Sequence, residues 1–221
     1  MEETLEVKSA KEESAIRRTR RTAKRIQKWD ILKAFLIYCV VLGHIADSYT
    51  DTFLEMKKLY FFIYIYHMPL FIFVSGLFAK KAINRNRIDR IIGYIVLYLA
   101  MEAAFFAYTV VYYHNYNLAL LTEKTVPWFM LALPIFMGIT MLLKRVAPRY
   151  VICVSIFLAC LAGYEAQIGD FLVLSRVIVY YPFYYLGYVM NREVLEDLCD
   201  RKLLKVLSVL VIACTAYIVI R

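Results

Sequence analysis

The chain has 221 residues, of which 62% are hydrophobic, and its mean hydropathy is +0.59. A soluble domain is about 45–50% apolar, so a globule of this length could not bury the excess while keeping a wet surface. The composition excludes an ordinary cytosolic enzyme, a disordered protein and a collagen, and it predicts a polytopic membrane protein. The net charge of +9 would suit nucleic acid, but the basic residues flank apolar stretches. We interpret them as a topology signal and expect no nucleic-acid partner.

The first 28 residues are polar and basic and contain no apolar core, so they do not resemble a cleavable signal peptide. We expect residues 1–28 to form a basic cytoplasmic tail and residues 29–221 to form an integral membrane domain. After the tail come seven apolar stretches: 31–49, 59–79, 91–113, 127–143, 151–166, 175–190 and 203–220.

A helix needs about 20 residues to cross a bilayer, and a span must be helical because lipid offers no partner for backbone polar groups. The predicted fold class is therefore all-α, a transmembrane helix bundle of about seven spans. Counting Lys33 with the tail, 22 Lys and Arg residues lie in the tail and in or beside alternate loops, against four in or beside the other loops. Cytoplasmic loops carry the basic excess, which places the N-terminus in the cytoplasm and the C-terminus outside.

Ionisable residues inside a span are costly and usually mark function. His44, His67 and Glu102 lie in three different predicted spans. At 1.5 Å per residue, each lies roughly 16–18 Å from the cytoplasmic side. Lys33 is eleven residues before His44, close to three helical turns, so the two share a helix face.

A neutral imidazole can take or carry a proton near pH 7, which makes His44 the leading catalytic candidate. Asp47 lies three residues further along and could accept a hydrogen bond from His44 and fix its tautomer. Structural roles stay open for two of these residues. His67, which lies near Pro69, could serve packing alone, and so could Glu102. Five cysteines without a C-x-x-C spacing signal no metal site.

Five segments, in the right order, resemble the acyltransferase-3 family in its fucose O-acetylase-like branch. They are Trp29-Asp30-Ile31-Leu32-Lys33 leading to Val41-Leu42-Gly43-His44, His67-Met68-Pro69-Leu70-Phe71-Ile72-Phe73-Val74-Ser75-Gly76, Arg87-x-x-Arg90, Trp128–Leu133 and Phe183–Tyr188. The family's pattern in the first helix is a basic residue, ten residues and then His, which Lys33 and His44 match.

The resemblance implies a membrane-bound acyltransferase that transfers groups other than amino-acyl groups and is similar to O-acetyltransferases. The donor would be cytoplasmic acyl-CoA, most often acetyl-CoA, with no metal. The acceptor would be a hydroxyl of a sugar, glycolipid or cell-envelope molecule, in a multi-pass protein of the bacterial cytoplasmic membrane. Lys33, Arg87 and Arg90 would bind the phosphates of the donor, which basic side chains suit. His44 would act as base or transient acyl carrier, His67 would polarise the thioester carbonyl or orient the acceptor, and Glu102 would position a proton.

Two other functions stay open. Family members usually have about ten spans, so a chain with seven is expected to be incomplete at the C-terminus, and an inactive truncated member is one alternative. The other is a transporter or flippase for a polar lipid or sugar, in which the same buried polar residues would line a pathway.

Overall fold

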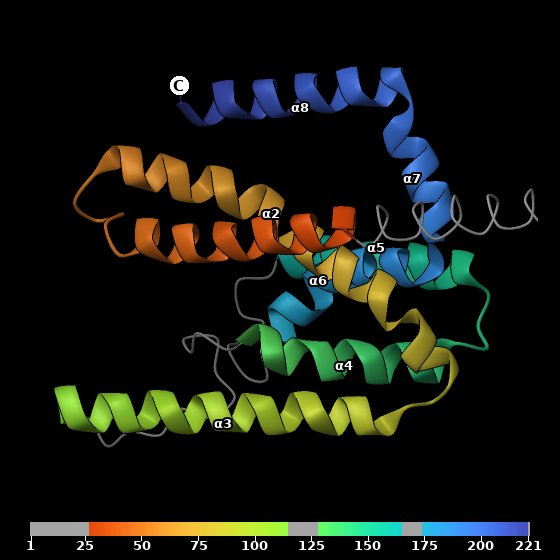
Figure 1. Ribbon diagram of the computed structural model, residues 1–221, viewed down its shortest axis with the longest axis horizontal. Coiled ribbons are helices and arrows are strands. Elements are labelled where there is room, and N and C mark those ends of the chain that lie inside the picture. The colour runs from red at the N-terminus through yellow and green to blue at the C-terminus, as the bar shows by residue number, and fades with distance from the viewer. Residues whose placement is uncertain (1–26, 115–127, 165–173, 221) are drawn as a thin grey trace, which may run out of the picture. The chain divides into compact units, whose positions relative to one another are not determined.

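The computed structural model describes residues 27–114, 128–164 and 174–220, so almost the whole predicted cytoplasmic tail lies outside the described residues. Within those ranges the chain forms helices and connecting turns, with no β-strand. Figure 1 shows the helices, of which the first carries no label: Gln27–Asp47, α2 (Leu54–Asn84), α3 (Ile88–Tyr113), α4 (Trp128–Leu143), α5 (Pro148–Tyr164), α6 (Leu174–Val189), α7 (Arg192–Asp200) and α8 (Lys202–Ile220).

Each of the seven predicted apolar stretches coincides with one helix, and the boundaries differ by up to five residues. The short helix α7 has no counterpart in the apolar pattern, because five of its nine residues are charged and none is buried. Hydrophobicity alone therefore predicted the apolar helices and missed the polar one.

In the described part of the chain, four helices are long and apolar enough to cross a bilayer, and they span Gln27–Asp47, Leu54–Asn84, Ile88–Tyr112 and Lys202–Val219. Two shorter apolar helices are α4 and α5. The protein is an all-helical, multi-pass membrane protein, as the composition predicted. The count of seven spans and the cytoplasmic N-terminus stay predictions.

The connection between α2 and α3 is short and has a defined turn. Asn86 adopts a left-handed conformation with φ 49°, which asparagine tolerates better than most residues. The amide of Arg87 then donates to the carbonyl of Ala82 at 3.0 Å and so satisfies one of the last carbonyls of α2. This turn fixes where α3, with its predicted donor-binding residues, begins.

The chain divides into two compact units, residues 1–67 with 215–221 and residues 68–214, and each is described by itself. In the first unit, Leu36, Gly43 and Ala46 are buried and recur along one face of the first helix. Gly43 lies against α2: a Cβ at this position would be 3.8 Å from Ile63 Cγ2 and 4.0 Å from His67 Cε1. The first helix therefore contacts the N-terminal half of α2 directly beside His44.

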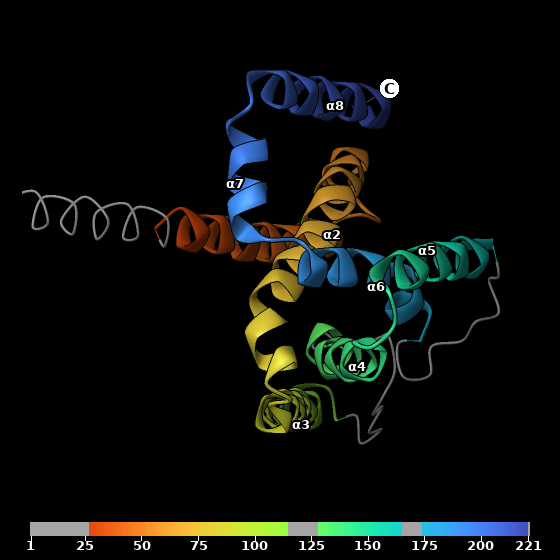
Figure 2. The ribbon, with the colours of Figure 1, turned by 90° about the vertical axis from the view of Figure 1, so that its right-hand side faces the viewer.

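The second unit is built around α4 and α6. Helix α4 packs against α3 and α6, and α5 packs against α6 (Figure 2). The rings of Phe136 and Tyr184 meet at 5.1 Å between centroids, and both side chains are fully buried. Thr140 donates to the carbonyl of Phe136 at 2.7 Å, and its hydroxyl lies 3.3 Å from the hydroxyl of Tyr181. The core of this unit is thus aromatic, and the buried hydroxyl of Thr140 within it is hydrogen-bonded.

Helices α2 and α6 cross at a pair of glycines within the second unit. A Cβ on Gly76 would collide with the backbone carbonyl of Tyr184, and a Cβ on Gly187 would collide with that of Phe73. The two backbones are close enough that no side chain fits between them, which is the usual role of glycine at membrane helix crossings.

Candidate functional site

Lys33 and His44 both lie on the first helix, as predicted. Lys33 is partly buried and forms an ion pair with Asp30 at 3.8 Å, one turn earlier. His44 is exposed and lies three residues before the end of the helix at Asp47. The face that carries Lys33 and His44 borders the buried face of Leu36 and Gly43, so the imidazole is near the helix contact without being enclosed by it.

His67 is the buried imidazole of the first unit, with 6% of its surface exposed. Its Nδ1 lies 2.9 Å from the backbone carbonyl of Ile63. A carbonyl oxygen can only accept, so Nδ1 carries the hydrogen, and the neutral ring then has its free lone pair on Nε2. Gly43, the residue before His44, lies against this ring, because a Cβ at position 43 would be 4.0 Å from His67 Cε1. The structure therefore brings the two predicted histidines into one neighbourhood, with the tautomer of His67 set by its own helix.

Asp47 is exposed at the last residue of the first helix. Its backbone carbonyl accepts from the hydroxyl of Thr50 at 2.9 Å, in the turn that follows. Among the described residues, no hydrogen bond or ion pair joins the Asp47 carboxylate to His44. Asp47 and His44 are thus neighbours in the sequence, but the predicted hydrogen bond between their side chains is not formed in the structure.

Glu102 lies on α3 in the second unit and is 4% exposed. Tyr98, one turn earlier, is buried on the same face, and α3 packs against α4. No described residue offers a hydrogen-bond partner to Glu102 Oε1. A buried carboxyl oxygen without a partner is costly, which distinguishes Glu102 from an ordinary packing residue.

Arg87 and Arg90 stand at the start of α3, also in the second unit. Arg87 forms a two-pronged contact with Asp89: Nε donates to Oδ1 at 3.2 Å and Nη2 donates to Oδ2 at 2.7 Å. This hydrogen bond and the charge of Asp89 raise the pKa of Arg87 above its ordinary value. Arg90 is exposed and interacts electrostatically with the same carboxylate. A phosphate that bound Arg87 would have to share the guanidinium with the Asp89 carboxylate or displace that carboxylate.

The predicted site residues thus fall into two groups. Lys33, His44, Asp47 and His67 belong to the first unit, and Arg87, Arg90 and Glu102 belong to the second. Within the described ranges, no group of three or more His, Cys, Asp or Glu side chains could hold a metal ion.

Sequence reasoning missed one contact of a charged residue. The charge pattern predicts only a role in membrane orientation for Lys80, yet its Nζ donates to the carbonyl of Val189 and to Asn191 Oδ1 at the α6–α7 junction. No pattern in a single sequence links residues more than a hundred positions apart, so this contact could be found only in the fold.

The fold is that of a multi-pass helical membrane protein, and His44 and His67 lie near one helix contact within it. A family model described as an acyltransferase domain, Acyl_transf_3, matches residues 26–220. The chain belongs to this acyltransferase family, as the resemblance predicted.

A curated relative is the nodulation protein NolL of Sinorhizobium fredii (strain NBRC 101917 / NGR234). It is 26% identical over 214 residues, which cover 86% of this chain and 56% of NolL. The chain therefore spans about half the length of the relative that it matches. No solved structure matches the chain.

Proposed function

We propose that the protein is a membrane-bound O-acyltransferase. It transfers an acyl group, most often acetyl, from cytoplasmic acyl-CoA to a hydroxyl of a sugar, glycolipid or cell-envelope acceptor. The observation that carries the proposal is the placement of His44 beside His67 in a chain of this family, with Lys33 three turns earlier on the same helix face.

The chemistry needs one proton acceptor. The acceptor hydroxyl oxygen attacks the thioester carbonyl carbon, His44 takes the hydroxyl proton, and the C–S bond breaks to release CoA as a thiolate, which regains the proton. In the second route, the imidazole of His44 attacks first and carries the acyl group until the hydroxyl displaces it. A trapped acyl-imidazole would select the second route.

His67 fits a positioning task in this scheme. With Nδ1–H donated to Ile63, the ring of neutral His67 presents Nε2 as a hydrogen-bond acceptor. An acceptor nitrogen can orient a hydroxyl, whereas polarising a thioester carbonyl requires a donor. We therefore assign His67 to the acceptor hydroxyl, and not to the donor carbonyl.

Within the second unit, Arg87 and Arg90 would bind the phosphates of the donor. Guanidinium groups bind phosphate with two parallel hydrogen bonds. Arg87 already shows this geometry toward Asp89. Asp89→Asn would remove the competing charge, so we expect a lower KM for acyl-CoA with kcat little changed, whereas Arg87→Gln would raise KM.

The main test uses the full chain, purified into lipid nanodiscs, with radiolabelled acetyl-CoA and a panel of sugars and glycolipids. Release of free CoA and labelled product are both measured. His44→Ala should reduce transfer by about 10²–10⁴-fold, the usual size of a general acid–base contribution. Movement of an acceptor across the bilayer without loss of thioester would instead support a transporter.

His114→Asn is the matched control, because it removes an imidazole from the exposed C-terminal cap of α3. Residue 114 has a positive φ of 51°, which asparagine tolerates, so the fold should be kept. Transfer by this variant should equal that of the unmodified protein. Equal transfer by His44→Ala and His114→Asn would remove His44 from the mechanism.

A further inference from the structure

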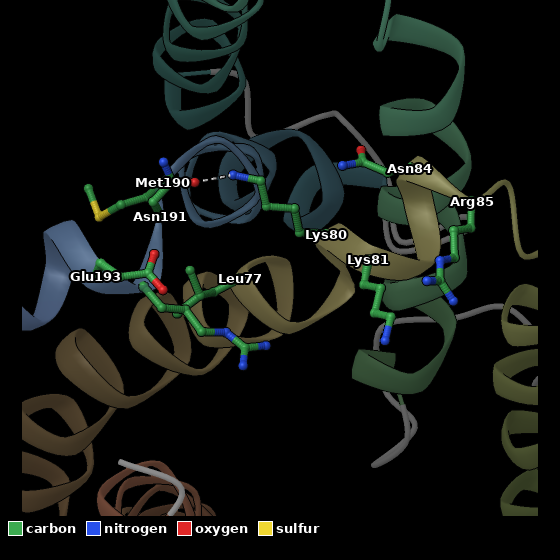
Figure 3. Close-up of a pocket in the computed structure, with 9 residues that line it drawn as sticks. Leu77, Lys80, Lys81, Asn84, Arg85, Met190, Asn191 and Glu193 are labelled. Carbon is green, nitrogen blue, oxygen red and sulfur yellow. Dashed lines mark hydrogen bonds between the residues drawn. The ribbon is translucent and has the colours of Figure 1, made fainter. Parts of the chain in front are cut away.

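A basic pocket of about 520 Å³ lies in the second unit, where the end of α2 meets the junction of α6 and α7 (Figure 3). Its volume is in the range of small-molecule sites. The charged residues that line it are Lys80, Lys81, Arg85, Arg192 and Glu193. Four cations face one acid, which leaves an excess of three positive charges.

The wall of the pocket is held by specific contacts. Lys80 Nζ donates to the carbonyl of Val189 at 3.2 Å and to Asn191 Oδ1 at 2.6 Å, as the dashed line in Figure 3 marks for one of these. The hydroxyl of Tyr188 donates to Asn84 Oδ1 at 3.0 Å. These bonds join the last turns of α2 to the α6–α7 junction, so the pocket is formed before any ligand enters it.

Lys81 and Arg85 provide the uncompensated charge. They are one helical turn apart, and both are exposed. No described residue forms an ion pair or hydrogen bond with either side chain. Like charges at this spacing repel each other, and an anion between them would relieve that repulsion.

Two further features of the pocket favour a phosphorylated ligand. Asn191 is the N-cap of α7 but makes no side-chain capping bond, and its Oδ1 accepts from Lys80. The first amides of α7, which have no intrahelical partner, are therefore not capped by this side chain, at the helix end that attracts anions. Met190, which is partly exposed, adds an apolar side chain beside the charges.

We infer that this pocket is a phosphate-binding site, formed by Lys81, Arg85 and the first turn of α7, for a phosphorylated ligand. Coenzyme A and an anionic phospholipid both present such a phosphate. Basic residues that only set the orientation of α2 in the membrane would not need to form a pocket. The inference does not rest on the acyl-transfer reaction, and the residues differ from Lys33, Arg87 and Arg90.

The test compares two double variants of the full chain in phosphatidylcholine nanodiscs at low ionic strength. Lys81→Gln with Arg85→Gln removes the pocket charges and keeps Lys80. The control, Arg145→Gln with Lys202→Gln, removes two exposed charges that do not line the pocket. One arm titrates CoA by calorimetry, and the other counts phosphatidylglycerol bound in mixed nanodiscs by native mass spectrometry.

Loss of two charge-assisted contacts should weaken at least one of the two ligands by about tenfold or more. The control should stay within about twofold. Selective loss of CoA binding identifies the donor as the source of the phosphate, and selective loss of phosphatidylglycerol identifies the lipid; either supports the site. Equal affinities for both ligands in the two double variants would overturn it.

A third variant guards against misfolding. Glu193→Gln removes the acid that lines the pocket and should strengthen binding of the same ligand by about threefold. A misfolded protein cannot produce such a gain. Weaker binding by Glu193→Gln in a protein of unchanged thermal stability would contradict the inference.

Discussion

Helix α2 takes part in two helix contacts of opposite character. At Gly43 the first helix meets α2 with ordinary van der Waals spacing, and two histidines lie at the contact. At Gly76 and Gly187, α2 meets α6 with the two backbones touching. The first contact has room for a side chain, and the second has none at the two glycines.

The difference separates two uses of glycine. At the α2–α6 crossing, removal of the side chain allows close packing, which is a main source of helix association in lipid. At Gly43 an added methyl group would be accommodated, so close packing does not explain this glycine. The tight crossing should therefore control stability, and the looser contact should control chemistry.

The largest expected effect is at the tight crossing. Gly76→Ala and Gly187→Ala each place a Cβ against a backbone carbonyl that cannot turn aside. Overpacking of this kind costs about 1–3 kcal/mol, equivalent to a fall in Tm of roughly 2–12 °C for a chain of this size. Thermal unfolding in detergent, followed by fluorescence, measures it. A variant with unchanged Tm would show that the helices separate here at little cost.

The next effect is at the histidine contact. His67→Leu keeps an apolar volume in a buried position and removes Nε2, so transfer should fall by roughly 10–100-fold. The Tm should fall by only a few degrees, because one hydrogen bond to Ile63 is lost. Full transfer by His67→Leu would assign His67 to packing.

A smaller effect is expected inside the core of the second unit. Thr140→Val removes the hydroxyl that lies 3.3 Å from the hydroxyl of Tyr181. The buried tyrosine then loses a partner, at a cost of about 1 kcal/mol, or a Tm lower by roughly 2–4 °C. Tyr181→Phe combined with Thr140→Val should recover part of the loss. No recovery in the double variant would mean that the two hydroxyls do not interact.

The smallest effect is expected at Gly43. Gly43→Ala adds a methyl group at 3.8 Å from Ile63, an ordinary packing distance. Alanine is also the better helix former, so Tm should stay within a few degrees or rise slightly. Because Gly43 faces His67 Cε1, transfer activity is the sharper measurement, and we expect it within about twofold. A large loss of stability would mean that this contact is as tight as the other.

Much of the fold follows from the sequence because lipid forces apolar stretches to be helical. The seven stretches each match a helix, and five segments in the right order, among them the motif from Lys33 to His44, identified the family. The polar helix α7 escaped prediction because apolar runs were the signal used, and five of its nine residues are charged.

The site was less predictable, because spacing along a helix fixes a face but not a contact. Asp47 has the spacing to reach His44, yet its position at the helix end gives it no bond to that ring among the described residues. Arg87 lies just before α3 and forms two hydrogen bonds with the carboxylate of Asp89, two residues further along. This contact does not follow from helical spacing. The tautomer of His67 depended on a backbone carbonyl, which residue types do not reveal.

The pairing of Arg87 with Asp89 gives the turn before α3 an internal stand-in for phosphate. The carboxylate presents two oxygens to the guanidinium, as a phosphate would. If Arg87 binds the donor as proposed above, the phosphate would exchange with the Asp89 carboxylate, so donor binding would depend on the competition between these two anions.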